Sequence, residues 1–140
     1  MFLRRPSLDV LNRGGADTLL AALGIEITEL GEDFLRGRMP VDARTRQPYG
    51  LLHGGASVAL AETLGSMAGN LCLDAERYVA VGLEVNANHL RPVTAGHVTG
   101  TARPIHLGRS TQVWDIRIED AAGRPSCVAR LTLAVVLKSK

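Results

Sequence analysis

A single acidic residue, Glu62, is set in a long segment of small and apolar side chains. It is the only charged residue between Gly54 and Leu73. Burying a carboxylate costs free energy unless it is paired, hydrogen-bonded or protonated, so a glutamate in this setting needs a reason. We favour catalysis, with the carboxylate as a base or a nucleophile. The structural alternative is an ion pair with an arginine such as Arg91.

The sequence around Glu62 predicts a helix whose start can bind developing negative charge. Apolar side chains recur there at helical spacing, at Ala56, Leu60, Leu64, Met67, Ala68 and Leu71. The opposite side carries small residues, so we expect a helix that is buried on most sides. A helix N-terminus offers free N–H groups, and Gly54 and Gly55, which have no Cβ, would let a ligand approach them closely.

The composition excludes several classes of function. The chain has 140 residues, 4% aromatic residues and a net charge of +2 with scattered basic residues, which does not suit a nucleic-acid-binding surface. Cys72 and Cys127 form no CxxC motif, and this favours reduced thiols in the cytoplasm. We expect no metal, because metal-ligand spacing is absent from the four histidines, which are His53, His89, His97 and His106.

No targeting or membrane segment is expected. Arg4 and Arg5 are followed by Pro6 rather than by the apolar run of a signal peptide. The segment from Gly54 to Leu73 approaches the length of a membrane span, but Glu62 and several glycines within it argue against that interpretation.

The remaining sequence predicts one domain, residues 15–140, preceded by a loose arm, residues 1–14. A short helix is expected over Asp17 to Leu23, ended by Gly24. Alternating patterns then predict strands, at residues 25–30, 34–39, 78–90, 96–107, 112–119 and 127–137. Gly100 and Pro104 indicate a bulge or an edge in the fourth of these.

The strand that begins at Tyr78 has a clear period of two. We expect one face to carry Val79, Val81, Leu83, Val85 and Ala87, and the other Glu84, Asn86 and Asn88. Successive strands joined by short turns favour an antiparallel sheet wrapped around the one long helix, an α+β fold. A single helix leaves the sheet edges exposed, so we expect dimerisation by edge-to-edge strand pairing.

These elements resemble the hotdog fold, and the helix region is similar to that of acyl-CoA thioesterases. The resemblance is closest to bacterial thioesterases that act on 1,4-dihydroxy-2-naphthoyl-CoA and related aroyl-CoA substrates. It spans nearly the whole chain in the order of the family. The residues that carry it are Gln47, residues 50–57 (GLLHGGAS), Glu62, Gly65-Ser66-Met67, residues 82–89 (GLEVNANH) and residues 106–109 (HLGR).

The resemblance implies four catalytic positions. Glu62 would be the nucleophile or general base, at an interface with a partner subunit, and the choice between a covalent anhydride and water activation stays open. The N–H of Gly54 would bind the thioester oxygen. Gln47 would orient substrate or water. His53 has two open interpretations, a bond to the thioester region or a cap of the helix.

Substrate-binding positions are expected around these catalytic ones. Gly55 would let the ligand approach, and Gly82 would leave room for pantetheine beside its strand. The acyl group would contact Ser66, Met67 and His89, although a back-bonded serine and a core histidine are the structural alternatives. The phosphates of CoA need cations or N–H groups, which could come from Arg91, His106, Gly108, Arg109 and Ser110.

The leading hypothesis is therefore a metal-free, cytoplasmic acyl-CoA thioesterase that needs no cofactor, since CoA is part of the substrate. A hotdog dehydratase or hydratase and a non-catalytic acyl-CoA-binding module are the alternatives. The sequence leaves open the acyl group, the choice between CoA and carrier-protein thioesters, and the choice between a homodimer and a homotetramer.

Overall fold

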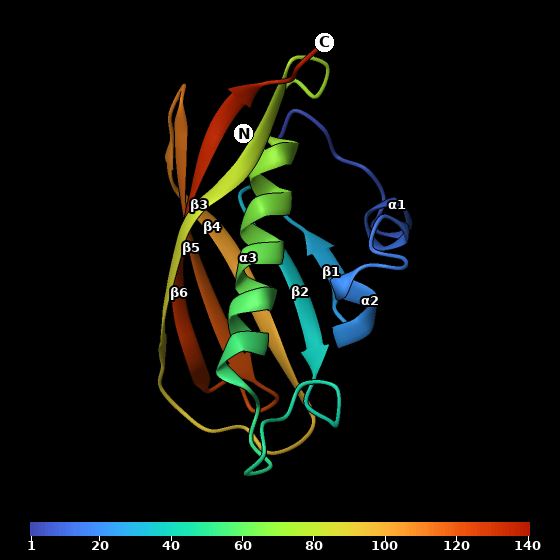
Figure 1. Cartoon of the computed structure of the whole chain (residues 1–140), viewed down its shortest axis with the longest axis vertical. Helices are drawn as coiled ribbons and strands as arrows, with labels where there is room; N and C mark the ends of the chain where they lie inside the picture. Colours follow the sequence, from blue (N-terminus) through green and yellow to red (C-terminus); the bar gives the residue numbers. More distant parts are fainter.

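A long helix, α3 (Gly54–Leu71), lies against one face of a six-stranded antiparallel sheet in the computed structural model, which describes residues 1–140 (Figure 1). The strands follow the order β1-β2-β4-β5-β6-β3 across the sheet. The other elements are α1 (Leu8–Arg13), α2 (Leu19–Leu23), β1 (Glu26–Leu30), β2 (Leu35–Pro40), β3 (Tyr78–His89), β4 (His97–Leu107), β5 (Thr111–Asp120) and β6 (Pro125–Leu137).

Glycines in the sheet allow α3 to pack closely against it. A Cβ added at Gly37 of β2 or at Gly100 of β4 would come within 2.9 Å or 2.8 Å of the Leu64 side chain, which is fully buried. A polar contact fixes the last turns of the helix, because the buried Gln112 donates to the Gly69 carbonyl and accepts from the indole N–H of Trp114. These contacts hold the two faces of α3 in a defined orientation on the sheet.

At each edge of the sheet, one asparagine side chain forms hydrogen bonds with both backbone groups of a residue in the edge strand. At the β1 edge, Asn12 accepts from the Ile27 N–H at 2.7 Å and donates to the Ile27 carbonyl at 3.0 Å. At the β3 edge, Asn70 accepts from the Ala80 N–H at 2.9 Å and donates to the Ala80 carbonyl at 3.1 Å. The β1 edge is further covered by α1, whereas β3 is exposed from Val81 to Glu84.

The N-terminal residues are more ordered than the expected loose arm. Residues 8–13 form α1, capped by the Ser7 hydroxyl, and the buried Leu11 joins the core. Further upstream, the N–H groups of Leu3 and Arg4 both donate to the Leu71 carbonyl at the end of α3. The helix expected from Asp17 begins at Leu19, because Asp17 has a φ of 59° and Thr18 is the N-cap.

The expected faces of β3 are wrong over its first half. A register shift lies between Gly82 and Glu84, so the extra residue exchanges inside and outside along the strand. Ala80 is therefore buried, while Val81 and Leu83 are 43% and 62% exposed. Beyond the bulge, Val85 and Ala87 pack against the core as expected.

The expected neighbours of β3 and β4 also differ from the structure. Residues 90–96 carry the chain across the sheet, so β3 pairs with β6 at one edge and β4 lies between β2 and β5. The strand with Gly100 and Pro104 is thus interior, and its irregularity is a register shift between Pro104 and His106. A local pattern does not distinguish a hairpin from such a crossing connection.

Candidate active site

Glu62 lies in an apolar cleft beside α3. The cleft has a volume of about 710 Å³, and Glu62 is half-buried at its middle. None of the six ion pairs in the protein involves this carboxylate, so the pair with Arg91 that the sequence left open does not form. The other lining residues are Leu19 and Leu20 of α2 and Gly55, Val58, Ala59, Thr63, Ser66, Met67 and Asn70 of α3.

The carboxylate of Glu62 rests against β3 at Gly82. A Cβ added at Gly82 would come within 2.9 Å of Oε1 of Glu62. The strand therefore supports the carboxylate only because this position has no side chain. The sequence suggested only that Gly82 leaves room for pantetheine. The structure shows that Gly82 also contacts the carboxylate of Glu62.

The start of α3 combines a cap with a free donor. The Gly55 N–H donates to Nδ1 of His53 at 2.7 Å, so His53 is the N-cap, which is one of its two open interpretations. Nδ1 is an acceptor in this bond, and the neutral ring then carries its proton on Nε2. Gly54 occupies the first helical position, where the N–H has no acceptor within the helix. That N–H and the helix dipole favour negative charge nearby.

A second cleft, of about 330 Å³, lies on the other side of Gly54 and brings together Gln47, His89 and Arg91. The Gln47 Oε1 accepts from the N–H groups of Tyr49 and Leu51, which folds the preceding loop and leaves the amide NH₂ free to donate. The His89 ring lies over Gly54, and a Cβ added there would come within 2.8 Å of Nε2.

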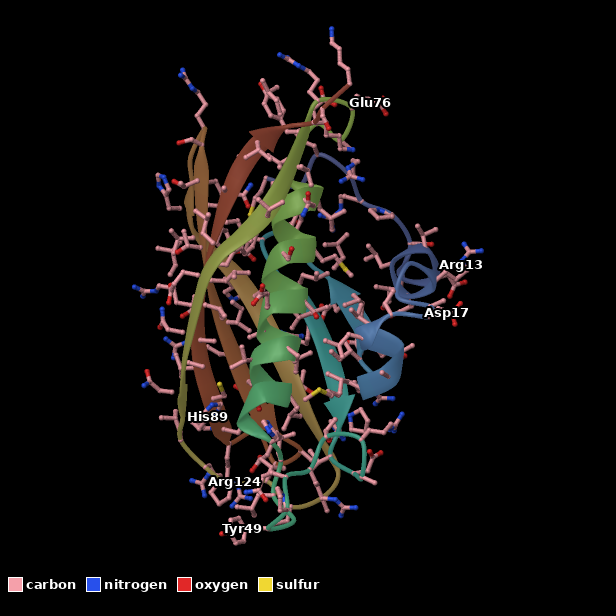
Figure 2. All side chains as sticks on the ribbon, viewed as in Figure 1. Arg13, Asp17, Tyr49, Glu76, His89 and Arg124 are labelled. Carbon is pink, nitrogen blue, oxygen red and sulfur yellow. The ribbon has the colours of Figure 1, made fainter.

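The remaining expected site residues lie at the other end of the sheet. His106, Gly108, Arg109 and Ser110 form the end of the β4–β5 hairpin, beside the part of β6 that pairs with the start of β3. Figure 2 shows His89, the last residue of β3, near the lower end of the molecule, and Glu76, just before the start of β3, near the upper end. One protomer therefore does not bring this hairpin together with Arg91 and Gly54.

The sequence interpretation missed the wall of the Glu62 cleft. Leu19 and Leu20 contribute one side of it, and Thr63 and Asn70 contribute to the other. The signal available was a short helix with adjacent leucines, one of which, Leu19, is 59% exposed. Leu19 shares the cleft with Val58 and Met67, and contiguous apolar surface of this kind marks binding sites and interfaces.

The structure describes three further features that bear on function. No three metal-binding side chains lie close enough together to hold an ion. None of the helices is both long enough and apolar enough for a membrane span. Cys72 and Cys127 are free cysteines, and burial raises the pKa of both thiols, so they are poor nucleophiles.

Known proteins share this architecture and sequence. A family model described as the thioesterase superfamily matches residues 49–127. The 1,4-dihydroxy-2-naphthoyl-CoA hydrolase of Escherichia coli K12 is 50% identical, and the alignment covers 95% of this chain and 97% of that protein. The proofreading thioesterase EntH of Cronobacter turicensis is 53% identical, with 95% of this chain and 96% of that protein covered.

A solved structure extends the similarity to three dimensions. A mutant of the thioesterase PA1618 from Pseudomonas aeruginosa matches with a TM-score of 0.97 and 54% identity, covering 98% of this chain and 99% of that chain. The sheet and its single long helix form the hotdog fold, and the names of these relatives identify a thioester hydrolase, as the sequence predicted. This chain belongs to the thioesterase superfamily.

Proposed function

We propose that the protein hydrolyses an acyl-CoA thioester to a free acid and CoA, with Glu62 as nucleophile or general base. The observation that supports this most directly is a half-buried carboxylate with no cationic partner in a largely apolar cleft. A carboxylate without a salt bridge keeps its lone pairs available for a water molecule or an acyl carbon.

The thioester carbonyl needs a donor for the charge that develops on its oxygen. The Gly54 N–H suits this role, because it is free at the first position of α3 and the His53 ring already occupies the next N–H. The free NH₂ group of Gln47, in the adjoining cleft, would orient the substrate or the attacking water.

One protomer cannot use both groups on the same thioester. Gly54 and Glu62 are separated by eight residues of α3, which corresponds to about 12 Å along the helix. A nucleophile must come within about 3–3.5 Å of the acyl carbon. We infer that each site takes Gly54 from one subunit and Glu62 from another.

The two edges of the sheet differ in their capacity to bind that second subunit. Asn12 and α1 occupy the β1 edge, whereas Asn70 blocks β3 only at Ala80. Open backbone groups on an exposed strand such as β3 are a template for another strand. Antiparallel pairing of β3 with its copy would also bring the hairpin at His106 of one subunit toward the Arg91 end of the other.

Coenzyme A would then lie across the subunit boundary. Its phosphates need cationic or N–H donors, and Arg91 and the hairpin carrying Arg109 and Ser110 are the candidates on the two subunits. Gly55, Ser66, Met67 and His89 would contact the acyl part. We propose an aromatic acyl group, which agrees with the largely apolar cleft and with the naphthoyl-CoA substrate in the name of the Escherichia coli relative.

Thiol release from benzoyl-CoA and 1,4-dihydroxy-2-naphthoyl-CoA tests the proposal. Glu62→Gln and Glu62→Ala should lower kcat by at least about a hundredfold. Glu76→Gln, an exposed glutamate in the loop after α3, is the matched control and should retain activity. Full activity of both Glu62 variants would refute the assignment.

A shared site is tested by combining two defective subunits. Glu62→Gln and Gln47→Ala chains would be co-expressed with different tags, and the mixed dimer purified by both. Such a dimer contains one intact site and one doubly defective site, so it should recover about half of the wild-type activity. If each site belonged to a single chain, the mixed dimer would be as inactive as its parents.

A further inference from the structure

A further cavity, here named the second cavity, adjoins the Glu62 cleft near the C-terminal end of α3 and lies under the N-terminal residues. It is distinct from the cleft that contains Gln47. Its volume is about 460 Å³. Apolar side chains from three elements line it, including Val10 and Leu11 of α1 and Leu71 of α3, together with the backbone of Gly14 and Gly15. The size and lining are those of a small-molecule site rather than of a packing defect.

The two cavities share one wall. Leu20, Met67 and Asn70 line both of them. Asn70 is fixed, because its amide binds the Ser66 carbonyl and both backbone groups of Ala80. Leu20 and Met67 are held by apolar contacts alone, and both are only half-buried.

The shared wall can therefore open without breaking a hydrogen bond. Met67 has an unbranched, adaptable side chain. Leu20 comes from α2, which has only five residues, and it packs against Gly15, where an added Cβ would lie 3.1 Å from its Cβ and Cδ2. Rotation of these two side chains would join the cavities into one channel along α3.

The one charged group at the rim of the second cavity is Arg4. The Arg4 guanidinium donates to the Asn70 carbonyl at 2.8 Å. Beyond Arg4, most of the surface that the cavity offers is apolar, which favours an apolar occupant. From Glu62 to Leu71 the helix rises by about 13.5 Å, a distance that only an extended chain would span.

We propose that this second cavity is a subsite for the distal part of a long acyl chain, which passes between Leu20 and Met67 when its thioester is at Glu62. The inference rests on the proposed acyl-CoA hydrolysis and gives that site a second class of substrate, beyond compact aromatic acyl groups. Each buried methylene should raise kcat/KM by about fourfold, until the cavity is filled.

A substitution on α1 can fill the second cavity and leave the Glu62 cleft unchanged. Val10 lines the second cavity only, and Val10→Trp should occupy it. Leu8 lies on the same helix and lines neither cavity, so Leu8→Trp is the matched control for a bulky residue on α1. Leu20→Ala should have the opposite effect, because it widens the opening.

The experiment measures thiol release from saturated acyl-CoAs between butanoyl and hexadecanoyl, with benzoyl-CoA as the compact reference. Val10→Trp should lower kcat/KM for dodecanoyl-CoA by at least about tenfold and leave the benzoyl-CoA value unchanged. Leu8→Trp should follow the wild type, and Leu20→Ala should shift the preference toward longer chains. Identical chain-length profiles for Val10→Trp and Leu8→Trp would overturn the proposal.

Binding of dodecanoic acid by calorimetry provides a readout that does not depend on hydrolysis. Wild-type protein and Leu8→Trp should bind it, and Val10→Trp should lose at least about tenfold in affinity. Equal affinities would overturn the subsite. Absence of thiol release from every acyl-CoA, with dodecanoic acid binding still sensitive to Val10→Trp, would instead overturn the proposed hydrolysis and leave the subsite in place.

Discussion

The imidazole of His89, at the end of β3, lies directly over Gly54, at the start of α3. Nε2 of His89 would be only 2.8 Å from a Cβ at position 54. The end of the edge strand and the first N–H of the helix are thus in contact, although 35 residues of sequence separate them. Any movement of β3 relative to α3 changes the surroundings of that N–H.

This contact predicts that Gly54→Ala changes the free energy of unfolding in opposite directions with and without the His89 side chain. Gly54→Ala gains up to about 1 kcal/mol of helix propensity, but in the wild type it must displace the His89 ring, which costs about 1–3 kcal/mol. It should therefore destabilise the wild type and stabilise the His89→Ala variant. Urea unfolding of the four proteins in this cycle measures the difference. Equal effects in both backgrounds would show that the ring is not the obstacle.

The contact between Gly82 and Glu62 predicts that Gly82→Ala lowers activity without lowering stability. The atom that a Cβ at position 82 would meet is Oε1 of Glu62, the end of a flexible side chain, so Gly82→Ala should leave the melting temperature nearly unchanged. The carboxylate would move by a few tenths of an ångström, and we expect kcat to fall by about tenfold. Thr99→Ala, on β4 and away from both the Glu62 cleft and the β3 edge, is the control. An unchanged kcat for Gly82→Ala would mean that the position of the Glu62 carboxylate does not matter.

Much of this fold follows from local patterns in the sequence. The bounds of α3 are visible because Leu60, Leu64 and Ala68 repeat at helical spacing after two glycines. The strand patterns also place β1, β2, β5 and β6 to within a few residues, because most of their inward side chains recur at every second position.

Features that depend on distant partners could not be predicted in this way. The bulge after Gly82 is formed against β6, and β3 reaches the far edge of the sheet because residues 90–96 cross it. The helix α1 has six residues, too few to be stable alone, and it is held by packing of Leu11 and by Asn12. The leucine wall of the Glu62 cleft has the same origin, since α2 faces α3 only in the folded chain.

The hydrogen bonds of Asn12 to β1 predict that Asn12→Ala lowers the free energy of unfolding and leaves the oligomeric state unchanged. Asn12→Ala leaves the N–H and carbonyl of Ile27 without their partners, and it should cost about 1–3 kcal/mol of unfolding free energy. Asn12→Asp can still accept from the N–H but cannot donate to the carbonyl, so its loss should differ from that of alanine. Urea unfolding gives the free energies, and light scattering gives the mass. A change of mass for Asn12→Ala would place the subunit interface at β1 instead of β3.

Asp120 predicts how the protein responds to acid. Its carboxylate accepts from the backbone N–H of Arg124, from the Arg124 guanidinium and from the Ala122 N–H, and these bonds lower its pKa below the ordinary 3.8. A carboxylate with a lowered pKa stabilises the fold fully when the pH is above its pKa in the unfolded chain, and this contribution is lost as the pH falls through its pKa in the folded protein.

Below about pH 4, the melting temperature of the wild type should therefore fall more steeply than that of Asp120→Asn, which keeps an acceptor oxygen but does not titrate. Glu32→Gln, at an exposed position in the β1–β2 turn, is the control and should follow the wild type. Parallel curves for Asp120→Asn and the wild type would show that the turn between β5 and β6 does not depend on the ionised form of Asp120.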